Sequence, residues 1–84
     1  MDPQAITRLD THARTLAEKL GLHATVSMKE QDKAEVNPTD PHLVLTVFHS
    51  PAEQRQREFR PDAPNLMAQI EQEIPVLAQE LGPH

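Results

Sequence analysis

The segment His-Leu-Val-Leu-Thr-Val-Phe-His, at residues 42–49, decides the fold of this 84-residue chain. The residues between its two histidines alternate between two largely apolar faces of a strand: Leu43, Leu45 and Val47 on one, and Val44, Thr46 and Phe48 on the other. A strand that is apolar on both faces suits the centre of a sheet, between two neighbours. The pattern alone does not tell which set faces the core.

A strand with one buried face is predicted at 22–29, before this segment. Apolar and polar residues alternate there, and the apolar set is Leu22, Ala24, Val26 and Met28. Residues 31–41 are polar and contain Asn37-Pro38 and Asp40-Pro41, which predicts a loop.

The segment after the central strand has two interpretations. Ser50-Pro51-Ala52-Glu53 matches a capping box and favours a short helix through Phe59. The alternative is a tight turn followed by an edge strand at 54–60. We prefer the strand, because two strands alone are marginal and the central strand needs a second neighbour. Its charged side chains would also protect an exposed sheet edge.

An amphipathic helix is predicted at each end of the chain. The first begins after the N-cap Asp2, with Pro3 at its first position, and ends at Gly21. Its apolar stripe consists of Ile6, Leu9, Ala13, Leu16, Ala17 and Leu20.

The second helix is predicted at 63–81, capped by Asp62 or Ala63 and stopped by Gly82-Pro83. Its stripe consists of Leu66, Met67, Ile70, Ile74, Leu77 and Leu81. Pro75 lies inside it and removes one backbone hydrogen bond, so we expect a kink or break between Glu71 and Pro75, with Ile74 and Leu77 still facing the sheet.

These elements predict one α+β domain over residues 1–84, in the order α-β-β-β-α. It is a two-layer domain, in which a three-stranded antiparallel meander carries both helices on one face, because a two-layer domain has a single core.

The composition limits the classes of partner that the chain is expected to bind. A net charge of −5 disfavours phosphate backbones and anionic membranes. The first residues resemble no signal peptide, and the longest apolar run is far too short to span a membrane, so we expect no membrane association. The absence of cysteine excludes thiol chemistry and fits a cytoplasmic protein.

No motif indicates an enzyme, a metal or a cofactor. The five histidines are His12, His23, His42, His49 and His84. They show no metal-ligand spacing, and the two in the central strand point to opposite faces. Ser50, beside His49, is explained as a turn residue. Both glycines are explained as helix caps, which leaves no phosphate-binding loop.

The order α-β-β-β-α resembles that of double-stranded-RNA-binding domains, which read RNA with lysines at the start of the last helix. Here that stretch is Asp62-Ala63-Pro64-Asn65 and has no basic residue. The first half is also similar to the opening of some KH-type domains, but their GXXG loop is missing. The basic residues left for nucleic acid are Arg55, Arg57 and Arg60, interleaved with glutamates. We therefore keep nucleic-acid binding only as an alternative.

The remaining informative feature is surplus apolar surface. Two helices on one face leave the other side of the central strand open, and we assign Val44, Thr46 and Phe48 to it. The sequence thus predicts a non-enzymatic protein-interaction module. Its partner is a second copy of itself, joined through the open sheet face, or another protein.

Overall fold

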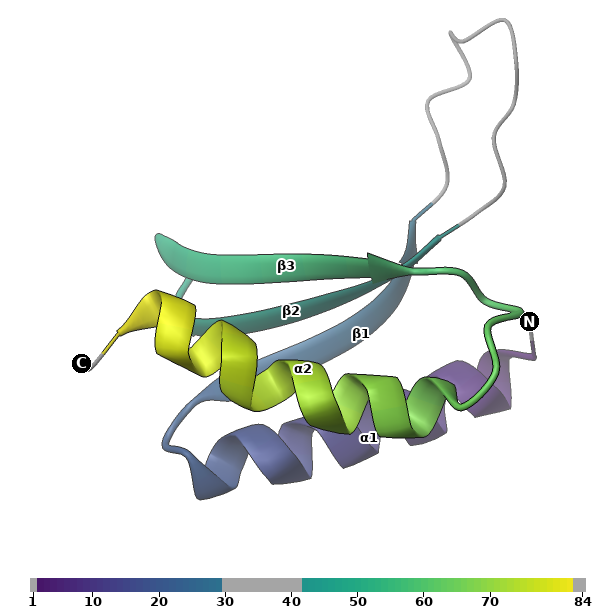
Figure 1. Ribbon diagram of the computed structural model, residues 1–84, viewed down its shortest axis with the longest axis horizontal. Coiled ribbons are helices and arrows are strands. Elements are labelled where there is room, and N and C mark those ends of the chain that lie inside the picture. Colours follow the sequence, from purple (N-terminus) through teal and green to yellow (C-terminus); the bar gives the residue numbers. More distant parts are fainter. Residues whose placement is uncertain (1, 30–41, 83–84) are drawn as a thin grey trace, which may run out of the picture.

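The computed structural model describes residues 2–29 and 42–82. They form two layers, with a sheet on one side and two helices on the other (Figure 1). The elements in chain order are α1 (Pro3–Lys19), β1 (His23–Lys29), β2 (His42–Ser50), β3 (Glu53–Phe59) and α2 (Leu66–Leu81). The predicted α+β order is therefore confirmed. The loop expected at 31–41 and His84 lie outside the described residues.

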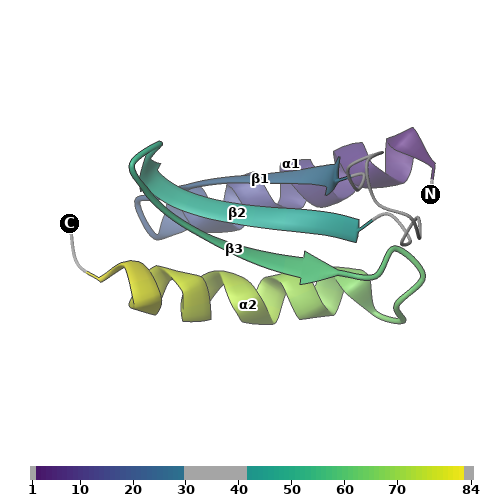
Figure 2. The ribbon, with the colours of Figure 1, turned by 90° about the horizontal axis from the view of Figure 1, so that it is seen from above.

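The sheet is an antiparallel meander with β2 in the centre (Figure 2). Leu45, in the middle of β2, lies opposite Val26 of β1 and Arg57 of β3. The strand preferred for the ambiguous segment is confirmed, and only Pro51 and Ala52 separate it from β2. Sheet pairing thus overrides the local capping-box signal, because β2 gains its second neighbour.

The two ends of α1 follow the predicted caps. Asp2 accepts a hydrogen bond from the Gln4 N–H at 3.0 Å, with Pro3 at the first helical position. At the other end Gly21 has a φ of 75°, a left-handed conformation that favours glycine. The N–H of Leu22 then donates to the carbonyl of Ala17, and that of Gly21 to Glu18. This pair of bonds is a Schellman motif, which turns the chain directly into β1.

The start of α2 differs from the prediction. The helix begins at Leu66, and neither Asp62 nor Ala63 caps it. Asn65 is the N-cap, with φ 59° and ψ 39° and no side-chain capping bond. Ala63 precedes Pro64, whose ring disfavours helical backbone in the preceding residue, and the left-handed Asn65 interrupts the chain again. The helix can therefore start only after both residues.

Pro75 does not break α2, which runs as one helix from Leu66 to Leu81. The proline is exposed, whereas Ile74 and Leu77 are buried against the sheet as predicted. Glu71, whose carbonyl loses its helical partner, is exposed as well. Solvent can hydrate a carbonyl on this side, which explains why the helix continues.

The core settles which face of β2 is buried. Leu43, Leu45 and Val47 are fully buried beneath the helices. The other core residues are Leu9, Ala13 and Ala17 of α1, Ala24 and Val26 of β1, Leu66, Ile70, Ile74 and Leu77 of α2, and Leu22. Because both helices contribute to this one cluster, they cover the same face of the sheet (Figure 1).

Three residues of the predicted helix stripes, Ile6, Leu16 and Leu81, are partly buried against this core, and two more, Leu20 and Met67, are exposed. Leu20 is 50% exposed and Met67 is 37% exposed. Leu20 follows the last residue of α1, and Met67 follows the buried Leu66 in the first turn of α2. Within the described residues, no helix is long and apolar enough to cross a membrane.

Candidate functional site

The residues predicted as an interface lie together on the open face of the sheet. Val44, Thr46 and Phe48 alternate with the core residues of β2 and point away from both helices. Val44 and Thr46 are nevertheless only 6% and 9% exposed, and Phe48 is partly buried. The open face is therefore less apolar at its surface than the sequence indicates.

Polar side chains of the two edge strands cover these residues. The Lys29 ammonium of β1 lies 3.7 Å from the Glu58 carboxylate of β3, so the pair spans β2. The Gln56 amide donates to the Thr46 hydroxyl at 3.2 Å. At the far end the ring of His23 stacks on Phe48, with centroids 5.4 Å apart. The result is a face with one aromatic anchor and a charged pair at opposite ends.

The outer edge of β1 is occupied by α1. The Val26 N–H donates to the Asp10 carboxylate at 2.7 Å, and the same carboxylate pairs with Arg14 at 2.8 Å. An edge strand presents backbone groups to which another strand can pair. Asp10 removes one such donor from the middle of β1, which protects this edge.

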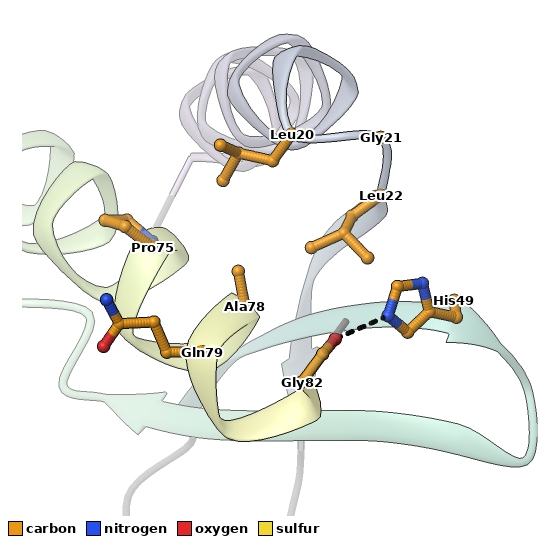
Figure 3. Close-up of a pocket in the computed structure, with 8 residues that line it drawn as sticks. All are labelled: Leu20, Gly21, Leu22, His49, Pro75, Ala78, Gln79 and Gly82. Carbon is orange, nitrogen blue, oxygen red and sulfur yellow. Dashed lines mark hydrogen bonds between the residues drawn. The ribbon is translucent and has the colours of Figure 1, made fainter. Parts of the chain in front are cut away.

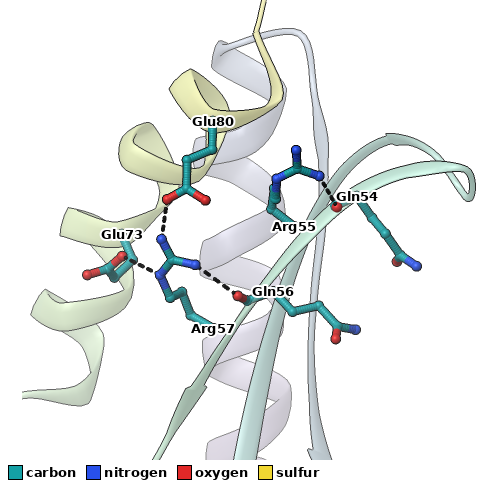
Figure 4. Close-up of polar contacts among 6 residues, drawn as sticks. All are labelled: Gln54, Arg55, Gln56, Arg57, Glu73 and Glu80. Carbon is teal, nitrogen blue, oxygen red and sulfur yellow. Dashed lines mark hydrogen bonds and ion pairs between the residues drawn. The ribbon is translucent and has the colours of Figure 1, made fainter.

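The arginine side chains of the edge strand β3 bond to the backbone of their own strand, as Figure 4 shows. Arg55 donates to the Gln54 carbonyl at 3.0 Å, and Arg57 donates to the Gln56 carbonyl at 3.1 Å. These guanidinium groups occupy carbonyl oxygens that a foreign strand would need. The sequence-based expectation that charge protects this edge thus has a geometric basis.

Arg57 also ties α2 to the sheet. Its guanidinium lies 3.4 Å from the Glu73 carboxylate and also contacts the carboxylate of Glu80, which lies two helical turns further along α2 (Figure 4). Arg55 and Arg57 lie opposite Val47 and Leu45 in the register, so they occupy the helix side of β3, and Arg60 follows the strand. With Arg57 neutralised by two glutamates, the three arginines do not form one basic surface of the kind that phosphate contacts require.

The remaining titratable groups of the described residues lie in separate pairs rather than in one cluster. His12 of α1 donates to Glu71 of α2 at 2.7 Å, whereas Glu73 faces Arg57, so the two glutamates diverge as their spacing indicates. Among residues 2–29 and 42–82, no group of three or more potential ligands is placed to hold a metal.

The structure adds a second candidate site that the sequence did not reveal. An open groove of about 720 Å³ lies where α1 and α2 end (Figure 3). Leu20, Leu22, Pro75 and Ala78 supply its aliphatic walls. At its border the His49 Nε2–H donates to the Gly82 carbonyl at 3.3 Å (Figure 3). The one signal in the sequence was Leu20, an apolar residue that continues the stripe of α1 to the point where the helix stops.

Comparison of the chain with protein-family models, with curated proteins and with solved structures finds no match. The function therefore has to be argued from the two surfaces just described.

Proposed function

We propose that this domain is a non-enzymatic protein-interaction module that forms a homodimer through the open face of its sheet. The observation that carries the proposal is the arrangement of Lys29, Phe48 and Glu58 on a face that no helix of the described chain covers. Both sheet edges are partly occupied by Asp10 and the β3 arginines, which disfavours edge-to-edge pairing and leaves the face.

The face is self-complementary under one symmetry. A two-fold axis that runs parallel to β2, between two copies, places β1 of one copy over β3 of the other. This axis keeps the position of each residue along the strand, and Lys29 and Glu58 differ by only two register positions, roughly 7 Å, so Lys29 lies within side-chain reach of Glu58 of the partner subunit. Phe48 faces Phe48 of the partner subunit. A two-fold axis perpendicular to the strands would place no acidic residue opposite Lys29. The charges therefore favour the axis parallel to β2.

The size of the face sets the expected strength. Strands of seven residues at about 3.3 Å per residue, spaced about 4.8 Å apart, form a face of roughly 15 by 23 Å. The side chains that project from each face add to its flat area, so two such faces bury roughly 1,100 Å² of accessible surface in total. This area is at the low end for specific interfaces. Since Val44 and Thr46 are already buried in one copy, we expect a weak dimer that assembles reversibly at micromolar to millimolar concentration.

Light scattering on a size-exclusion column, from micromolar to millimolar protein, tests the proposal. The mass should rise from 9.5 kDa toward twice that value. Phe48→Lys should remain a monomer, and Gln72→Lys should dimerise as the parent does, because Gln72 is an exposed residue of the helix layer. A 9.5 kDa mass at every concentration would refute the homodimer.

A charge exchange tests the symmetry. Lys29→Glu and Glu58→Lys should each weaken the dimer, and the double variant should restore it, because the exchange preserves both intermolecular pairs. Thermal melts should show that each single variant remains folded, since an exposed ion pair contributes only ~0.2–1 kcal/mol to stability. If the double variant stayed monomeric while the parent dimerised, the two-fold axis along β2 would be wrong.

The cytoplasmic location belongs to the same proposal. It is supported by the cysteine-free composition, which gives no sign of an oxidising compartment.

A further inference from the structure

The open face of the sheet carries a histidine on its central strand. His42 is the first residue of β2, lies two residues before Val44 on the same face, and is half-buried. We propose that protonation of His42 weakens the homodimer, so that at one protein concentration the domain shifts from dimer toward monomer as the pH falls from about 8 to about 5.5. This inference rests on the proposed dimer and adds the regulation of its interface.

The two-fold axis of the dimer places the two His42 side chains against each other. An axis parallel to β2 keeps each residue at its height along the strand, and β2 lies between β1 and β3 (Figure 2), nearest the axis. Each residue on the open face of β2 therefore meets its own copy. Phe48 does so at one end of the face, and His42 does so at the other. Sheets packed face to face lie about 10 Å apart, which brings the two imidazole rings to within roughly 6 Å of each other.

The charged groups of the described residues around His42 do not offset a further positive charge. Lys29 of β1 is the register partner of His42, and Arg60 follows the end of β3 at the same end of the face. Glu58 of β3 is the nearby carboxylate, and it already pairs with Lys29 at 3.7 Å. No helix of the described chain packs on this face. In each copy two cations stand against one carboxylate, so protonation of both histidines adds charge to a cluster that is already positive.

The direction of the pH effect follows from this geometry. Histidine gains its proton between about pH 8 and about pH 5. Two neutral imidazole rings can stack or share a hydrogen bond at the axis, whereas two imidazolium rings repel each other. Two unit charges about 6 Å apart, at a dielectric constant between those of water and a protein surface, change an equilibrium constant by about tenfold. Because the separated monomers bind these protons more readily than the dimer does, a fall in pH favours the monomer.

Sedimentation equilibrium of the full-length protein at the two pH values, at constant ionic strength, measures the Kd of the dimer. The Kd of the parent should rise about tenfold at the lower pH. His42→Gln cannot gain a proton and should have the same Kd at both pH values. His23→Gln is the matched control, because His23 lies on the same face but at the height of Gln54, an uncharged residue of β3. Its Kd should depend on pH as that of the parent does.

A fixed charge at the same position gives the converse test. His42→Lys carries its positive charge at both pH values, so its Kd at the higher pH should already be about tenfold above that of the parent, with little further change at the lower pH. The substitution is compatible with folding, because His42 is the first residue of its strand and only half-buried. Circular dichroism and thermal melts at both pH values check that every monomer is folded.

The outcomes separate this inference from the dimer itself. A parent dimer with one Kd at both pH values would overturn the role of His42 and leave the homodimer intact. A pH dependence that persists in His42→Gln, or that is lost in His23→Gln, would also overturn it, as would a monomer at the lower pH that is unfolded. A mass of 9.5 kDa at every concentration and both pH values would refute the homodimer and this inference together.

Discussion

The hydrogen bond from the Val26 N–H to Asp10 gives the sharpest test of how the domain is held together. The distance is 2.7 Å, and the Asp10 side chain is 20% exposed. Asp10→Ala leaves a partly buried backbone donor without its acceptor, which costs about 1.5–3 kcal/mol for a bond to a charged group. The Arg14 pair adds at most about 0.5 kcal/mol, because it is an exposed i,i+4 pair. We therefore expect a loss of about 2 kcal/mol.

For a domain of this size that loss lowers the melting temperature by roughly 8–16 °C. Asp10→Asn keeps an acceptor oxygen and should lose about half as much, while Arg14→Ala should change stability by less than about 0.5 kcal/mol. Urea melts give the free energies, and hydrogen exchange of the Val26 amide reports the bond directly. If Asp10→Ala were as stable as Arg14→Ala, the bond would contribute nothing and the account of the β1 edge would fail.

Two further substitutions test the attachment and continuity of α2. Arg57→Gln removes both glutamate contacts and should destabilise the fold by about 1 kcal/mol in urea melts. Arg55→Gln should change stability by less than about 0.5 kcal/mol, because Arg55 contacts no glutamate within residues 2–29 and 42–82. Equal effects would contradict the assigned role of Arg57. For Pro75→Ala we expect a small net change, within about 1 kcal/mol, because the regained hydrogen bond is offset by a gain of about 0.4–1 kcal/mol in the entropy of the unfolded chain. A stabilisation of several kcal/mol would show that the proline is strained.

Most of the fold is predictable because the apolar periodicity of each element agrees with the capping and turn residues at its ends. The alternation of β1, the two apolar faces of β2 and the caps at Asp2 and Gly21 all act within a few residues, so the sequence carries them directly. The start of α2 was missed because Asn65 adopts a left-handed conformation that no apolar pattern marks. The break that the sequence predicts at Pro75 is absent from the structure, because the cost of the proline depends on whether the carbonyl that loses its partner faces solvent.

The candidate surfaces are less predictable, because they depend on side chains that meet across elements. Alternation placed Val44, Thr46 and Phe48 on one face, but it could not show that Lys29 and Glu58 reach each other over β2. The groove depends on where two helix ends converge in space. No spacing within either helix encodes that convergence.

The agreement between strand order and chain order has a consequence for folding kinetics. Each strand pairs with the next one in sequence, and β2 and β3 form a hairpin closed by two residues. By contrast, the pair between His12 and Glu71 joins residues 59 positions apart. Contacts of short loop length form first, so the sheet with α1 should make up the folding nucleus and α2 should dock late. Ile74→Ala should accordingly speed unfolding far more than it slows folding, and stopped-flow measurements with Leu45→Ala as the comparison would resolve the two elements.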